Sequence, residues 1–274
     1  MLRLEAMGSS GTRGILNPLH GFQHFKLERE PPPDDLAAFV AGFWRVTWDL
    51  EEHAAFEQEI LPYPCVNLAF EQGAFQVHGP GTQRFVARLS GRGSAFGVRF
   101  KPAGFFAFSK VPLRSLVDRV LPVELATERA PALPEDANGV RQAACEFLRR
   151  FEARRDEKSL LVDELVDRAQ SDRGVARAED LAQIAGLSVR SLHRLFEQYV
   201  GVGPKWVVRR SRVQEAAERV ASGARVDWAR TAQELGYHDQ AHLIRDFREQ
   251  VGFTPEAYAR RCAAANATYT DANP

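Results

Sequence analysis

The sequence predicts an α+β protein. Its N-terminal half is an antiparallel β-rich barrel or sandwich with helices, and its C-terminal half is an all-α double helix-turn-helix domain. Short runs that alternate apolar and polar residues fill residues 43–100. Helical periodicity replaces this alternation after Lys101. A pattern of residues then occurs twice in the last third of the chain, about 51 positions apart, which indicates a duplicated structural unit.

Length and composition set the number of domains and their class. The chain has 274 residues, of which 45% are hydrophobic and 26% charged, as in globular proteins that do not span membranes. A chain of this length favours more than one core. It contains no run of the roughly 20 apolar residues that a membrane span needs and no apolar signal core, so we expect a cytoplasmic protein. We expect a β-rich domain with trailing helices over residues 1–170, a double helix-turn-helix domain over 171–265 and a flexible tail over 266–274.

The N-terminal elements follow from the change of periodicity along the chain. A short helix is predicted to start at Asp34, after three prolines. Six strands follow, separated by turns rich in Gly and Pro. They are predicted at residues 43–50, 56–61, 65–70, 75–78, 85–89 and 95–100. Helical spacing is then expected over residues 105–121, 140–151 and 159–169.

The first helix-turn-helix unit is predicted over residues 179–199. Gly186 would take the left-handed conformation that ends the scaffold helix, and the Ser188 hydroxyl would cap the next helix. Apolar residues at helical spacing behind that cap form the buried stripe. Arg190, His193 and Arg194 then face solvent near the start of the helix, where side chains of such helices meet base edges in a DNA major groove.

The second unit repeats this arrangement with Asp239 as the cap. Its helix turns Gln240, Ala241 and Arg245 outward, and arginine and glutamine pair well with guanine and adenine. Between the units, residues 204–221 form a long helix that would hold the two reading helices rigidly apart. Residues 173–262 carry 15 Lys+Arg against 11 Asp+Glu, a surplus that favours a nucleic acid as partner.

These two units resemble the DNA-binding domain of AraC/XylS-type transcription regulators. The resemblance rests on residues 187–196 and 236–247, closed by 252–258, and spans roughly residues 160–262. It implies a regulator that binds double-stranded DNA through Arg190, His193, Arg194, Gln240, Ala241 and Arg245. Alanine at position 241 departs from the polar residue often found there. RNA polymerase and a second copy of the chain are further candidate partners.

The N-terminal half is similar to domains found ahead of such DNA-binding domains, through residues 61–70 and 97–104. This resemblance implies a sensing or dimerising role, so we consider a small-molecule effector. The candidate effector-binding residues are Trp44, Trp48, Asn67 and Arg99. For the two tryptophans, an alternating aromatic stripe is also typical of barrel core.

Other functional classes find less support in the sequence. Three scattered cysteines predict buried thiols without a disulfide or zinc cluster. His20 and His24 have helical spacing, but no third ligand is placed, so we predict no metal and no cofactor. No hydrolase, zinc-protease or nucleotide-binding motif occurs, which predicts that the chain is not an enzyme. Two alternatives stay open: a small-molecule binding protein whose helical half docks a protein partner, and a DNA-modifying enzyme that uses Cys65.

Overall fold

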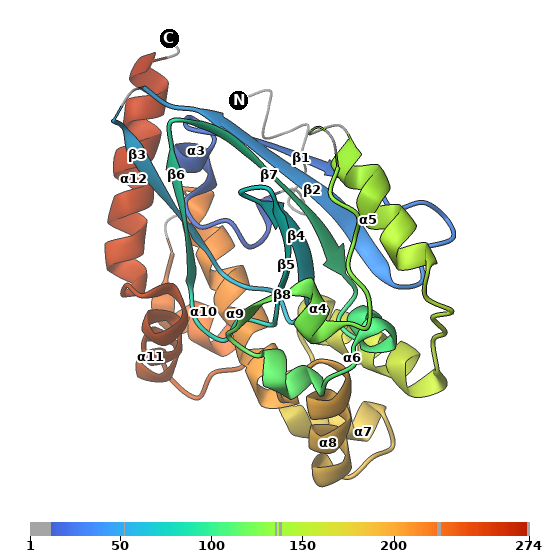
Figure 1. The fold of residues 1–274 in the computed structure, drawn as a ribbon. Helices are drawn as coiled ribbons and strands as arrows, with labels where there is room; N and C mark the ends of the chain where they lie inside the picture. The colour runs from blue at the N-terminus through green and yellow to red at the C-terminus, as the bar shows by residue number, and fades with distance from the viewer. Residues whose placement is uncertain (1–11, 52, 135, 137–138, 224–225, 273–274) are drawn as a thin grey trace.

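The computed structural model describes residues 12–272, apart from residues 52, 135, 137–138 and 224–225. A β-rich N-terminal half is followed by a helical C-terminal half, which confirms the predicted fold class (Figure 1). The main sheet is antiparallel with strand order β1-β2-β7-β4-β5-β8, and β3 pairs with β6 in a second, two-stranded sheet. The strands are β1 (Lys26–Glu30), β2 (Val40–Asp49), β3 (Ala55–Ile60), β4 (Asn67–Glu71), β5 (Ala74–His78), β6 (Phe85–Ser90), β7 (Arg92–Phe100) and β8 (Val120–Pro122).

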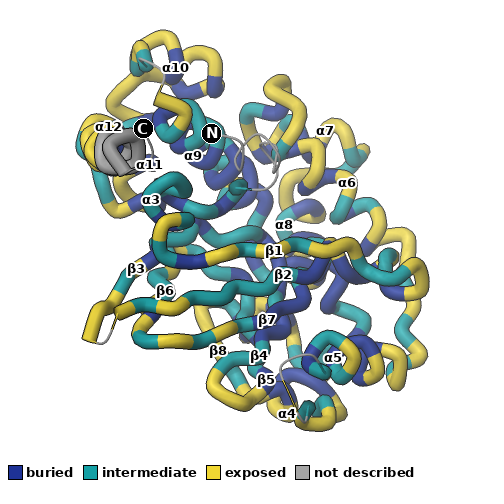
Figure 2. Tube along the Cα trace, turned by 90° about the horizontal axis from the view of Figure 1, so that it is seen from above, coloured by how far each residue is buried: buried dark blue, intermediate teal, exposed yellow. Residues whose placement is uncertain are grey.

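The two faces of the main sheet differ. Side chains alternate between the faces of a strand, so Phe43 and Trp44 point to opposite sides. Phe43, Val98 and Phe100 belong to a buried core that also contains Phe147 of helix α5 (Gly139–Arg149). The other face carries Trp44, and α5 lies on the side away from helices α9 to α12 (Figure 2). The main β-domain core is therefore built on one face of the sheet only.

The C-terminal helices form two further cores that share one helix. The helices are α6 (Glu157–Ser171), α7 (Ala178–Ile184), α8 (Val189–Tyr199), α9 (Pro204–Ala221), α10 (Trp228–Glu234), α11 (Gln240–Val251) and α12 (Pro255–Ala272). Val207 of α9 packs in one core with α6, α7 and α8. Val213 and Val220, further along α9, pack in another core with α10, α11 and α12. The predicted long connecting helix thus links both units through apolar packing.

The N-terminal half also packs against both C-terminal cores. Leu16 and Leu61 are buried in the core of the second unit, and the short helix α3 (Pro18–Gly21) lies against α12. The backbone N–H of Asn17 donates to the Tyr258 hydroxyl at 2.8 Å. On the first unit, the ring of Phe106 contacts the ring of Tyr199, with 4.3 Å between centroids. Both helix-turn-helix units are therefore docked on the β-rich half.

Two predicted elements differ from the structure, and one observed strand is absent from the prediction. Residues 34–39 form consecutive turns without a helix, and the chain enters β2 directly at Val40, which leaves no room for a longer helix. The helix expected over residues 105–121 is replaced by two 3₁₀ turns, η1 (Gly104–Phe108) and η2 (Leu113–Leu116), and by β8. Pro112 separates the two turns, since proline cannot donate a helical hydrogen bond. Strand β1 was not predicted, because its mostly charged residues show little apolar alternation.

The C-terminal end of the described chain is helical. Helix α12 continues to Ala272 where the sequence predicts a flexible tail from residue 266, and residues 273–274 lie outside the described residues. Helix α6, which the sequence places at the end of the β-rich domain, packs with α8 in the core of the first unit. No helix in the described ranges has the length and apolar character required to cross a bilayer.

Candidate nucleic-acid interface

The first helix-turn-helix unit is built by a tight turn and a side-chain cap. Gly186 has φ +64, a left-handed conformation that glycine adopts without steric cost. Ser188 then accepts a hydrogen bond from the backbone N–H of Ser191 at 3.2 Å, and α8 begins at the next residue. Both local features agree with the sequence prediction. Leu192 and Phe196 are fully buried behind the cap, which fixes the rotation of α8 about its own axis.

The cap offers a direct test of this local structure. Replacing Ser188 with alanine leaves the Ser191 N–H without its partner, and the free energy of unfolding should fall by about 1 kcal/mol. Urea unfolding followed by circular dichroism measures this change. Ser94→Ala, at an exposed position in β7, is the matched control and should leave the unfolding midpoint unchanged. Equal midpoints for both variants would contradict the capping role of Ser188.

The outward face of α8 carries the predicted reading residues. Arg190 and Arg194 are exposed, whereas His193 is half-buried and lies against the backbone at Gly203. Within the part of the chain that the structure describes, neither arginine forms an ion pair or a hydrogen bond through its side chain. The two guanidinium groups are therefore available to an external partner, and His193 is the least accessible of the three.

The second unit has the same construction. Gly236 has φ +68 at the turn, and the Asp239 carboxylate accepts from the His242 backbone N–H at 2.7 Å. This hydrogen bond lowers the pKa of Asp239, so the cap is charged at neutral pH. Gly252, with φ +86, ends α11. The predicted cap and turn residues of this unit therefore have the geometry expected from the sequence.

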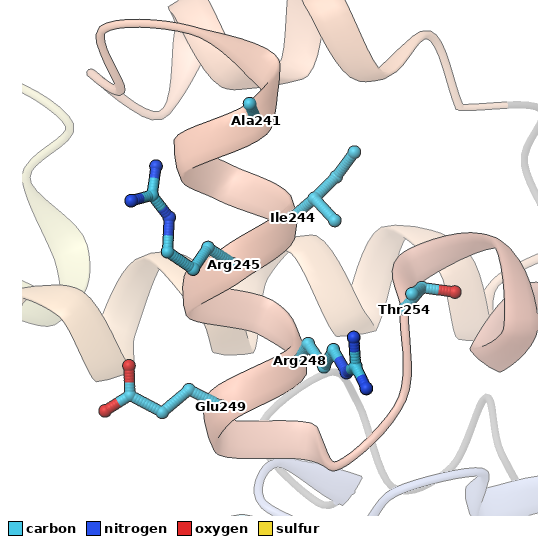
Figure 3. A pocket seen from close by; sticks show the side chains of 6 residues that line it. All are labelled: Ala241, Ile244, Arg245, Arg248, Glu249 and Thr254. Atoms are coloured by element: carbon cyan, nitrogen blue, oxygen red, sulfur yellow. The ribbon is translucent and has the colours of Figure 1, made fainter.

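The outward face of α11 presents a shallow hollow. Gln240, Ala241 and Arg245 are exposed. Ala241 and Arg245 line the hollow, and Arg248 projects near Thr254 at its other side (Figure 3). Like Arg245, Arg248 is exposed and has no ion-pair partner among the described residues. Arg248 is missing from the predicted set of reading residues, although its outward helical position is readable from the sequence.

An ion pair fixes α11 to the connecting helix. Arg209 of α9 donates from Nε and Nη2 to the two carboxylate oxygens of Asp246, at 2.9 and 2.8 Å, and from Nη2 to Glu249 at 2.7 Å. The hydrogen bond to Asp246 raises the pKa of Arg209. Asp246 itself is buried. Because both partners are held in place, the orientation of α11 is tied to α9 by more than apolar packing.

Three of the four candidate effector residues lie together on the sheet. Trp44 donates from Nε1 to Asn67 Oδ1 at 3.2 Å, and Asn67 pairs with Arg99 in the β4–β7 register. Trp48 lies further along β2, where its ring covers Gly93 and its Nε1 donates to the Ser90 carbonyl at 3.1 Å. Neither tryptophan belongs to a buried core cluster, so the alternative prediction that this stripe is barrel core is wrong for both residues.

The cysteines are placed as predicted. Cys65, Cys145 and Cys262 are all free and buried. Burial raises the pKa of the Cys65 thiol to about 11, so it is protonated at neutral pH and is a poor nucleophile. This environment disfavours the alternative in which Cys65 accepts a group from DNA.

Two parts of the chain match known domain families. Residues 181–261 match the family described as "Helix-turn-helix domain", and residues 28–122 match the family described as "Domain of unknown function (DUF6597)". The regulatory protein PocR of Salmonella typhimurium is 32% identical over 87 residues, which are 31% of this chain and 28% of that protein. An uncharacterised HTH-type transcriptional regulator of Haemophilus influenzae is 29% identical over 82 residues, or 30% of this chain and 27% of that protein.

The two curated relatives and this chain match only over part of their lengths. This chain spans less than a third of the length of the two curated relatives. Among solved structures, a probable AraC family transcriptional regulator from Rhodopseudomonas palustris is similar at 24% identity and a TM-score of 0.33, covering 37% of this chain and 96% of that one. The helix-turn-helix part of the expected resemblance is confirmed. Residues 181–261 match a helix-turn-helix domain family, and residues 28–122, ahead of them, match a domain family without known function.

Proposed function

We propose that this chain is a sequence-specific DNA-binding transcription regulator that reads double-stranded DNA with α8 and α11. One observation carries the proposal. The arginines on the two outward faces, Arg190, Arg194, Arg245 and Arg248, have no carboxylate partner within the described ranges. Six other arginines of this domain are ion-paired: Arg173, Arg209, Arg219, Arg230, Arg260 and Arg261. Arg177, Arg210 and Arg212 also have no ion pair among the described residues, so the four arginines are set apart by being unpaired, exposed and placed together on the outward faces of α8 and α11.

The unpaired arginines fit the chemistry of a DNA groove. An arginine presents two parallel donors that match the acceptors of guanine or a phosphate, and a carboxylate partner would compete for them. The proposed base-reading residues are Arg190, His193 and Arg194 of α8 and Gln240, Ala241 and Arg245 of α11. We add Arg248, at the far end of α11, as a phosphate contact. A regulator of this kind needs no catalytic site.

Selection of bound fragments from a random duplex library tests the proposal directly. The full chain should enrich a motif with two parts, because two reading helices joined by one rigid helix meet successive turns of the duplex, roughly 34 Å apart. Recovery of fragments with no shared motif would contradict sequence-specific reading. Enrichment of only one part would show that a single unit reads bases.

Affinity for the selected site should fall steeply with salt. Each neutralised phosphate releases counterions, so log K should decrease linearly with log salt with a slope of about −5 for roughly six phosphate contacts. Arg248→Ala should reduce the magnitude of this slope by about one, because it removes one phosphate contact. Fluorescence anisotropy over a series of salt concentrations measures both slopes. A flat response would exclude binding through the duplex backbone.

We also propose that a small-molecule effector controls this regulator. The β-rich half contacts both reading units, through Leu16 and Leu61 on one side and Phe106 on the other. A ligand that changes the packing of this half would therefore act on both units, provided that it binds two conformations with different affinity.

A further inference from the structure

One arginine of the β-rich half contacts the end of the second reading helix. Arg84, just before β6, lies against Gly252, where an added Cβ would come within 2.9 Å of the Arg84 guanidinium carbon. Gly252 is the residue that ends α11. The guanidinium carbon of Arg84 also lies 5.2 Å from the centroid of the Phe253 ring. Arg84 therefore touches the connection between α11 and α12 from outside the helical half.

A carboxylate of β3 binds Arg84 and a second arginine. Glu59 accepts a hydrogen bond from Nη1 of Arg84 through Oε1, and its Oε2 forms an ion pair with Nη2 of Arg261 in α12 at 3.4 Å. The guanidinium carbon of Arg261 lies 4.1 Å from the centroid of the same Phe253 ring. We call Glu59, Arg84, Phe253 and Arg261 the helix-end clamp. It joins β3 and the start of β6 to α12, which lies beside them (Figure 1).

The burial and the charges of the helix-end clamp favour one fixed geometry. The Glu59 side chain is 15% exposed and that of Arg84 is 29% exposed, so water screens their attraction less than it does for a surface pair. Two arginines and one carboxylate together carry a net positive charge at the C-terminal end of α11, where the helix dipole favours a cation. The contacts of both guanidinium groups with the Phe253 ring add to this attraction. The clamp therefore stabilises the end of α11 against the β-rich half.

The same two strands carry another Glu–Arg pair that does not reach the helices. Glu57 of β3 and Arg88 of β6 are opposite each other in the ladder, and Nε of Arg88 donates to Oε1 of Glu57 at 2.7 Å. Both side chains are more than half exposed. Arg88 makes no other hydrogen bond or ion pair with the described residues. The two pairs therefore share their chemistry and their strands, and differ in that only Arg84 contacts the end of α11.

We propose that Arg84 is a positioning residue for DNA reading by the second unit, and that the β-rich half sets the direction of α11 through the helix-end clamp. Asp239 caps the start of α11, Arg209 binds its Asp246, and Arg84 contacts its C-terminal end. A helix held at three points is already oriented when it meets the duplex, so association does not carry the free-energy cost of ordering it. This inference rests on the proposed function, whereas the clamp itself can be tested without DNA.

Hydrogen exchange of the full chain, without DNA and followed by mass spectrometry, tests the clamp. In Arg84→Gln, the backbone amides of residues 247–258 should exchange about five-fold faster, because a lost contact raises the population of locally open states. Arg88→Gln is the matched control and should leave this segment unchanged. Arg84→Lys keeps the positive charge beside Glu59 and should restore most of the protection. Equal exchange in the two glutamine variants, or an equal acceleration in the distant helix α5, would overturn the proposal.

Gel shifts with two duplexes then separate positioning from general stability. One is the selected two-part duplex, and in the other the part read by α11 is scrambled. Arg84→Gln should bind the two-part duplex about five-fold more weakly than the unchanged chain does, and the scrambled one equally well, because α8 is unaffected. Equal weakening on both duplexes, or tighter binding of the two-part duplex, would overturn the proposal. If the unchanged chain selects no duplex, the proposed function fails, while hydrogen exchange still decides whether Arg84 holds α11.

Discussion

Replacing both Arg190 and Arg194 with alanine should weaken binding to the selected duplex by at least about 30-fold, since each arginine–base pair contributes about 1–3 kcal/mol of discrimination. Both side chains are exposed on α8 and have no partner within the described residues, so their removal takes no contact from the fold. Gel shifts with specific and scrambled duplexes measure the loss. Binding to the scrambled duplex should change far less, because base contacts are what distinguish the two.

The matched control is Arg260→Ala in α12. Arg260 is also exposed and pairs with Glu256 one helical turn away. Its replacement removes one arginine from the same domain without touching a reading face, so it serves as the control for each of the two single replacements. The affinity of the Arg260→Ala variant for the selected duplex should stay within about two-fold of that of the unchanged chain, because a surface ion pair contributes little to stability. If the double variant retains specific binding, or if Arg260→Ala loses it equally, α8 does not read bases and the assignment of its outward face is wrong.

The helix-turn-helix half could be predicted closely because its determinants are local. Ser188 and Asp239 cap the residues that follow them, and Gly186 takes a conformation that few other residues tolerate. Each signal acts within four residues in the chain, so the sequence alone reveals it. Not every feature of this half is local: the carboxylate of Asp246 on α11 binds Arg209 of α9, 37 positions away in the chain.

The N-terminal half was predicted less well because its determinants are long-range. Residues 105–121 have helical spacing, but the 3₁₀ turn at Leu113 packs under α8, and β8 pairs with β5, so tertiary contacts override the local pattern. The face that carries Trp44 alternates like a core strand, yet the main core forms on the opposite face with α5. Arg210 donates to Gln214 four residues on, but its other acceptors are the Pro62 and Leu61 carbonyls, 148 and 149 positions earlier, which no local pattern reveals.

Replacing Asp246 with alanine should destabilise the second unit more than any surface change in this domain. The carboxylate is buried and accepts two hydrogen bonds from Arg209, so its loss leaves a partly buried guanidinium with Glu249 alone. Breaking a fully buried pair costs about 3–5 kcal/mol, and because the Arg209 side chain is 25% exposed we expect about 2–3 kcal/mol here. Urea unfolding of the full chain measures this loss.

Glu249→Ala is the control, because Glu249 binds the same Nη2 but its side chain is 56% exposed. Its effect should stay below about 1 kcal/mol, as for other solvent-exposed ion pairs. Asp246→Ala should also release α11 from α9, so that the duplex motif loses the part read by the second unit while the part read by α8 persists. Equal stability of the two variants, or an unchanged two-part motif in Asp246→Ala, would mean that apolar packing alone holds the reading helices in register and that the Arg209–Asp246 pair is dispensable.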